Sequence, residues 1–321
     1  MLTSLYPTAL VIALTLLFLR KNDMQRGGFL SIDYTNFIRS VAILFVIIHH
    51  VGNYSGVSIF TPLGGIGVAL FLMISGYGLN ESYNRKGLSG FWKSKLIRVL
   101  IPCWLIDCIF AVINWRTFEL WDFIQCLLCI KIDWYIRYLF YWYFAFYVFC
   151  RFVPQYRTLL MAITSAVMLC ILPGIEAEQS LSFITGYLLS LHNINTQPNR
   201  WQRISFLFFV FGIGFLAIKQ TPLIRELYGT IIYNLVELGL KWNIAFFIIL
   251  FGYNLYKLNF VSRFLSITGL MSFELYLIHC KLLPLVRNGY TVLNITLFFV
   301  ITYILSYILY RLDLKITKIF K

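Results

Sequence analysis

The sequence predicts an all-α fold, a polytopic bundle of transmembrane helices, and three observations lead to this prediction. Hydrophobic residues make up 60% of the 321 residues and charged residues only 12%, which is far more apolar than a soluble domain. Long apolar runs recur from one end of the chain to the other, as helices that cross a bilayer require. The basic residues fall between these runs, where they act as topology signals.

About eleven helices are expected, ten in the core and one extra helix at the N-terminus. The predicted spans are 3–19, 34–53, 63–81, 98–115, 134–150, 157–173, 180–191, 204–218, 242–258, 264–284 and 290–311. Residues 119–130 are too short to cross and are expected to lie at the interface or re-enter. The mixed stretch 219–241 is expected to be an outer amphipathic segment. The chain therefore divides into an N-terminal helix and basic linker, a membrane domain and a basic tail, at 1–30, 31–312 and 313–321.

The 27 basic and 13 acidic residues give a net charge of +14. No soluble module carries these charges, so nucleic acid is not expected as a partner, and membrane lipids are. The positive-inside rule places the C-terminal tail in the cytosol. Basic residues follow the first apolar run, so that run is expected to be a retained helix and not a signal peptide. The seven cysteines sit mostly in apolar runs, which favours buried thiols over a disulfide framework.

Arg39 and His50 are the first candidates for a functional site. Eleven residues separate them, which is close to a whole number of helical turns, so they share one helix face about 16 Å apart. Ionisable groups within a span are costly and are functional candidates by default. The bland alternative is an arginine that snorkels to the interface and a histidine bonded to a neighbouring helix.

Four motifs in this order resemble the acyltransferase 3 family, over about residues 31–312. They are Ile32-Asp33 leading into Phe37-Ile38-Arg39, then His50, then Gly67-Val68-Ala69-Leu70-Phe71 running to Ile74-Ser75-Gly76-Tyr77, and Ser272-Phe273-Glu274-Leu275-Tyr276-Leu277-Ile278-His279. The resemblance implies a membrane enzyme, most commonly an O-acetyltransferase. Such an enzyme moves acetyl from cytosolic acetyl-CoA to a hydroxyl of a surface polysaccharide or lipid-linked saccharide. It also implies a bacterial inner membrane.

Acyl transfer to a hydroxyl needs a base, and histidine has a suitable pKa. The resemblance makes His50 the leading catalytic residue, with Arg39 orienting the donor. Coenzyme A needs clustered cations, and Lys93, Lys95 and Arg98 supply them, although a topology anchor explains the same residues. No metal is expected.

The late motif places Ser272, Tyr276 and His279 on one helix face and Glu274 elsewhere. These residues are expected to line a cavity and bind the acceptor, with Glu274 as a supporting catalytic acid; helix-to-helix hydrogen bonds are the alternative. Trp134 and Arg137 are expected at an outer saccharide platform, and an aromatic belt explains the tryptophan equally.

Two further possibilities stay open from sequence. A glycan transporter or flippase would use the same buried polar residues without an acyl donor. Ser75 is a candidate for a covalent acyl intermediate, with packing beside Gly76 as the alternative.

Overall fold

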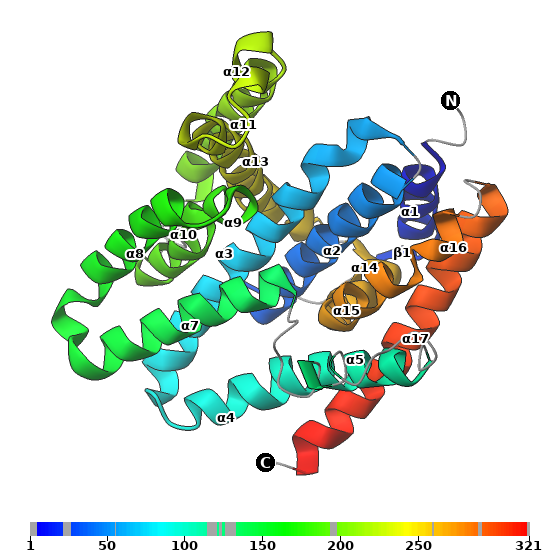
Figure 1. Cartoon of the computed structure of the whole chain (residues 1–321), viewed down its shortest axis with the longest axis horizontal. Helices are drawn as coiled ribbons and strands as arrows, with labels where there is room; N and C mark the ends of the chain where they lie inside the picture. The colour runs from blue at the N-terminus through cyan, green and yellow to red at the C-terminus, as the bar shows by residue number, and fades with distance from the viewer. Residues whose placement is uncertain are drawn as a thin grey trace.

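The computed structural model describes residues 5–21, 27–54, 56–113, 121, 124–125, 133–192, 198–258, 260–287 and 291–319, and the described chain is predominantly helical, which confirms the all-α prediction (Figure 1). The α-helices are α1 (Tyr6–Leu17), α2 (Ile32–Tyr54), α3 (Thr61–Lys86), α4 (Phe91–Lys95), α5 (Ile101–Ile113), α7 (Trp134–Phe152), α8 (Arg157–Ile171), α9 (Gly174–Ala177), α10 (Ser180–Leu191), α11 (Pro198–Lys219), α12 (Pro222–Glu226), α13 (Ile231–Lys257), α14 (Arg263–Leu270), α15 (Ser272–Leu282), α16 (Pro284–Arg287) and α17 (Val292–Ile319). Tight turns add η2 (Ser58–Phe60) and η4 (Pro154–Tyr156), and η3 (Leu96–Leu100) is π-helical.

Within the described residues, five helical runs are long and apolar enough to cross a bilayer, so the chain is an integral membrane protein. They are Ile32–Tyr54, Ser58–Lys86, Phe91–Ile113, Ile231–Lys257 and Val292–Ile319. Several other predicted spans are shorter helices. The N-terminal helix α1, for example, has 12 residues and is about 18 Å long, less than the roughly 30 Å of a bilayer core.

Helices α2, α3 and α10 form the centre of the bundle and touch backbone to backbone. A Cβ at Gly186 would lie 1.7 Å from the Met73 carbonyl oxygen, and one at Gly67 would lie 2.5 Å from that of Ala42. Only glycine permits such contacts, as is common where membrane helices pack closely. The glycines thus hold α3 closely against α2 and α10, and side chains of α2 and α3 form part of the site.

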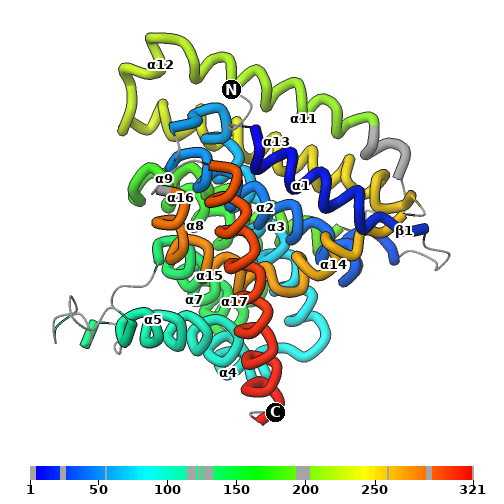
Figure 2. The backbone as a smooth tube through the Cα atoms, turned by 90° about the vertical axis from the view of Figure 1, so that its right-hand side faces the viewer, coloured from blue at the N-terminus to red at the C-terminus, as the bar shows by residue number. Residues whose placement is uncertain are grey.

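Helices α11 and α13 lie side by side in both views (Figures 1 and 2). The prediction of an outer amphipathic segment over 219–241 is wrong for its second half, because α13 runs without a break from Ile231 to Lys257. The charges that suggested a surface segment, Glu237 and Lys241, are buried and form an ion pair within the helix. Sequence patterning assigns such charges to a surface because it does not show their partners.

Two other predicted boundaries are also corrected. Residues 91–113 form one helical run, so the helix predicted at 98–115 begins earlier and includes Lys93 and Lys95. Its π-helical turn precedes Pro102, which cannot donate an i→i−4 hydrogen bond. The predicted span 264–284 is divided at Met271 into α14 and α15.

The N-terminal segment is packed on the rest of the fold. Strand β1 (Leu19–Lys21) pairs antiparallel with β2 (Phe260–Ser262), and α1 contacts α2 and α14 (Figure 2). The Tyr6 hydroxyl is 2.8 Å from the Thr296 hydroxyl on α17. Most of the short segment predicted at 119–130 lies outside the described residues.

Candidate functional site

Helix α2 carries the two leading candidates at separate cavities. It is unbroken from Ile32 to Tyr54, so Arg39 and His50 lie on one face, three turns apart, as their spacing predicted. Arg39 lines one cavity, named here the arginine cavity, and His50 lines another, named the histidine cavity. A single helix therefore links the two halves of the site.

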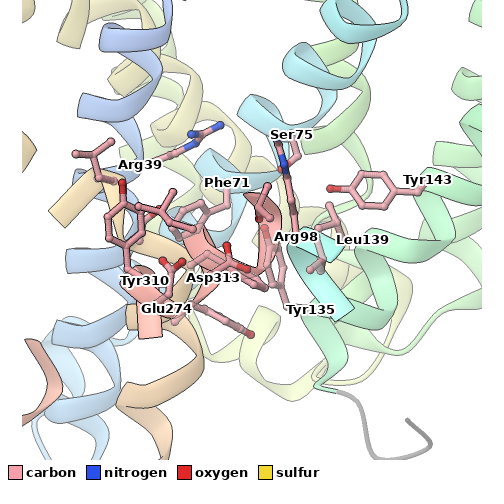
Figure 3. Close-up of a pocket in the computed structure, with 18 residues that line it drawn as sticks. Arg39, Phe71, Ser75, Arg98, Tyr135, Leu139, Tyr143, Glu274, Tyr310 and Asp313 are labelled. Carbon is pink, nitrogen blue, oxygen red and sulfur yellow. The ribbon is translucent and has the colours of Figure 1, made fainter. Parts of the chain in front are cut away.

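The arginine cavity has a volume of about 510 Å³ and opens between α2, α3, η3, α7, α15 and α17 (Figure 3). Its polar lining residues are Arg39, Ser75, Arg98, Tyr135, Tyr143, Ser272, Glu274, Tyr276, Tyr310, Asp313 and Thr317. Arg39 is exposed to this space although α2 is central in the bundle. The two guanidinium groups and several hydroxyls can bind the anionic and polar groups of a ligand, and the carboxyl groups of Glu274 and Asp313 line the same space.

Glu274 lines the arginine cavity together with Ser272 and Tyr276. The side chains of Glu274 and Asp313 both lie at the cavity wall in Figure 3. His279 is the member of the predicted set that does not line it. The late motif therefore serves both cavities from one short helix, because α15 lies between them.

The three cations predicted near η3 separate in the structure. Arg98 lines the arginine cavity and also a smaller cavity of about 220 Å³, which Lys93 and Lys86 line as well. Lys95 lines neither and places its ammonium 4.4 Å from the ring centre of Tyr143, a cation–π contact. Arg98 and Lys93 are thus the cations placed for an anion that extends out of the arginine cavity.

The histidine cavity has a volume of about 520 Å³ and lies at the opposite end of α2. Gly64 and Gly65 of α3 make room for it by accommodating side chains. A Cβ at Gly64 would lie 2.5 Å from the His49 ring, and one at Gly65 would lie 2.4 Å from the Lys241 side chain. The glycine-rich start of α3 therefore shapes this cavity by making room for the side chains of His49 and Lys241.

Three histidines meet near this cavity, and their hydrogen bonds distinguish them. His279 Nδ1 is 2.9 Å from the Leu275 carbonyl oxygen, which can only accept, so Nδ1 carries the proton. Its Nε2 lies 3.2 Å from the Cys280 thiol and accepts from it. His49 Nε2 accepts from the Asn53 amide at 3.2 Å. His50, whose ring centre is 5.2 Å from that of His279, has no hydrogen bond to the described residues, so its nitrogens are free for a ligand.

Tyr276 lines both cavities. Its hydroxyl donates to Asp133 Oδ1 at 2.5 Å, and the same oxygen accepts from the Tyr135 backbone N–H at the start of α7. The ring lies 5.8 Å from that of His279 and 5.1 Å from that of Tyr135, centre to centre. A molecule that entered through the arginine cavity would meet this ring before it reached His50.

The expected saccharide platform is only partly assembled. Trp134 lines the histidine cavity, whereas Arg137 does not and forms an ion pair with Glu176 at 2.6 Å. Four lining residues were not singled out from sequence: Glu178, Lys219, Glu237 and Lys241. The i,i+4 spacing of Glu237 and Lys241 was the available signal, but such a pair usually marks a solvated helix face.

The helical bundle and its two cavities define a membrane protein with an arginine-lined cavity and a histidine-containing cavity that share one lining tyrosine. Residues 32–311 match the acyltransferase 3 family, whose model describes an acyltransferase domain. The match covers most of the chain, which therefore belongs to this family and is a membrane acyltransferase. Neither the curated proteins nor the solved structures contain a match.

Proposed function

We propose that the protein is an O-acetyltransferase that moves acetyl from cytosolic acetyl-CoA to a hydroxyl of a cell-surface or lipid-linked saccharide. The observation that carries the proposal is the pair of cavities that α2 connects and that share Tyr276 as a lining residue. Transfer between substrates that arrive from opposite faces of a membrane needs such an arrangement, with each substrate held in its own cavity.

Coenzyme A is assigned to the arginine cavity. Its pyrophosphate and 3′-phosphate carry several negative charges, and arginine is the preferred partner of phosphate because its planar guanidinium donates two parallel hydrogen bonds. Arg98 and Lys93 would hold the phosphates at the edge of the cavity, and Arg39 would bind the donor's polar arm, which leads the thioester towards His50. The hydroxyls of Ser272 and Tyr276 would bond the polar groups of the donor between them. Lys95 supports the cavity wall through Tyr143 in this scheme.

His50 is assigned as the general base. The free ring nitrogen takes the proton of the acceptor hydroxyl as its oxygen attacks the thioester carbonyl carbon. The tetrahedral intermediate collapses, the C–S bond breaks, and the thiolate takes the proton back from His50. The products are the acetyl ester and coenzyme A, so protons and electrons balance. Arg39 lies about 16 Å from His50 along α2, so it would orient the donor and would not contact the reacting carbonyl.

His279 and Glu274 have supporting positions in this scheme. Both nitrogens of His279 already have hydrogen bonds, so it is assigned to position the His50 ring and not to take a proton. Glu274 is assigned to binding of the acyl donor, because it lines the arginine cavity in which the donor is placed. Ser75 also lies there, and direct transfer requires no acyl-serine.

The positive-inside rule supports the orientation. Lys93, Arg98 and the basic C-terminal end of α17 would lie in the cytosol, where acetyl-CoA is available, and His50 would lie towards the outer half. A bacterial inner membrane is the proposed location. Saccharide and lipid partners follow from that placement.

The test is transfer of labelled acetyl from acetyl-CoA to cell glycans in membranes that hold the intact chain, His50→Ala or a matched control. His192→Ala is the control, because His192 lies at the end of α10 and lines neither cavity. Loss of a general base lowers rates by about 10²–10⁴-fold, so we expect label on glycan with the intact chain and His192→Ala only. Equal labelling with His50→Ala would remove His50 from the mechanism. Glycan export without any use of acetyl-CoA would favour the transporter alternative.

A further inference from the structure

Four charged side chains form a chain of ion pairs in the wall of the histidine cavity, and the reaction scheme above does not use them. Lys241 pairs with Glu178 and, at 3.0 Å, with Glu237. Lys219 pairs with the other oxygen of Glu237. The four residues, named here the charged quartet, come from α11, α13 and the chain between α9 and α10. Glu178, Glu237 and Lys241 each expose less than a tenth of their surface.

The quartet is electrically neutral but retains hydrogen-bonding capacity. An ammonium has three donors, and Lys241 donates to Glu178 while its contact with Glu237 is an ion pair that leaves Glu237 Oε2 without a hydrogen bond to the described residues. Glu178 has a second carboxylate oxygen with no hydrogen bond to the described residues. The network therefore offers donors and an acceptor side by side while its charges cancel. Hydroxyl groups, which both donate and accept, match that combination.

The quartet is joined through α3 to His49, the neighbour of the proposed base His50. Lys241 packs on Gly65 and His49 packs on Gly64, the preceding residue. Gln179, which follows Glu178, donates to the Gly65 carbonyl oxygen at 2.9 Å. Aromatic rings of Trp134, Tyr228 and Tyr233 line the same cavity. A ligand bonded to the quartet would thus be held against the turn of α3 that supports the histidine pair.

We propose that the charged quartet is the acceptor-recognition subsite and that it selects a neutral sugar residue through its hydroxyl groups. This inference rests on the proposed function, because it names the substrate class of the same site. A carboxylate or an amine on the sugar would add a charge that the balanced, poorly solvated quartet cannot match. An extra charge on the ligand would be left without a partner beside three buried and one half-buried charge that already balance, and an uncompensated charge in such a place is costly.

The experiment compares three probes with the purified full-length chain in lipid nanodiscs, using saturation-transfer NMR, which needs no turnover. The probes are the methyl glycosides of glucose, glucuronic acid and glucosamine, which are neutral, anionic and cationic. We expect the intact chain to bind the neutral glycoside at least tenfold more tightly than either charged one. One lost charge-assisted hydrogen bond accounts for a difference of that size.

Variants of the quartet should change the preference in opposite directions. Lys219→Met leaves the quartet with a net negative charge and should shift preference to the cationic glycoside. Glu237→Gln leaves it positive and should shift preference to the anionic one. The double variant is neutral again and should regain the original order. Arg225→Met is the matched control, because Arg225 bonds Gln220 and does not line the cavity.

The outcomes separate this inference from the function on which it rests. Equal or tighter binding of a charged glycoside by the intact chain, or single variants that fold but keep the original order, would overturn the inference. Acetyl transfer to a charged acceptor would do the same and leave the acyltransferase function standing. Binding of the neutral glycoside without any acetyl transfer would refute the O-acetyltransferase proposal and leave the subsite.

Discussion

Replacing Gly186 with alanine should separate the two helices at the centre of the bundle. A Cβ at this position would lie 1.7 Å from the Met73 carbonyl oxygen and 2.5 Å from the carbonyl carbon, whereas ordinary contact begins at 3.4 Å. The obstacle is backbone, which cannot rotate away as a side chain can. The contact is reciprocal, because a Cβ at Gly76 would lie 2.1 Å from the Phe183 carbonyl oxygen. The helices α3 and α10 must therefore move apart by about the missing 1.7 Å.

The cost of such overpacking is typically about 1–3 kcal/mol, and a backbone clash of this depth belongs at the upper end. Alanine returns at most about 1 kcal/mol through its higher helix propensity. We expect a net destabilisation of about 2 kcal/mol or more, measured as a lower apparent melting temperature by tryptophan fluorescence in nanodiscs. Acetyl transfer should fall as well, because α3 lines both cavities.

Gly214→Ala is the matched control, since a Cβ there meets nothing within 4 Å on the exposed face of α11. This variant gains the higher helix propensity of alanine without a clash, so its melting temperature should equal or slightly exceed that of the intact chain. If Gly186→Ala melts no lower than Gly214→Ala, the close approach of α3 and α10 is refuted.

Three further predictions concern the cavities. Arg98→Met should raise the KM for acetyl-CoA about 10–100-fold and Lys95→Met much less, because Arg98 lines the arginine cavity and Lys95 does not. Similar increases in KM for the two variants would contradict this assignment. Gly64→Ala should lower the rate of acetyl transfer more than His49→Ala, because the added Cβ lies 2.5 Å from the His49 ring and displaces it, whereas loss of the His49 ring only leaves space. A larger loss of rate with His49→Ala would contradict this prediction. Tyr276→Phe should raise the rate at which acetyl-CoA is hydrolysed without an acceptor several-fold, because the ring loses the hydrogen bond to Asp133 that anchors it. An unchanged hydrolysis rate would show that packing alone holds the ring.

Several features of the fold could be predicted from sequence because they depend on local periodicity. The apolar runs predicted an all-α membrane bundle, and the family match confirmed the resemblance carried by the motifs from Ile32 to His279. The spacing of Arg39 and His50 predicted one shared helix face, because both lie in one unbroken helix and its pitch is constant. The positions of short helices and of helix breaks were harder to predict from sequence, and the division at Met271 was not predicted.

The sequence by itself determined the class of the protein, its long helices and the α2 face that carries Arg39 and His50. Only the tertiary structure showed that Glu274 lines the arginine cavity, that Lys95 packs on Tyr143, and that a charged quartet lies in the histidine cavity. The physical reason is the range of the interactions. Helical periodicity is set by neighbours within one or two turns, whereas the partner of a buried charge such as Glu178 lies 63 positions away on another helix. Whether such a charge is solvated, paired or available to a ligand depends on packing that no local pattern specifies.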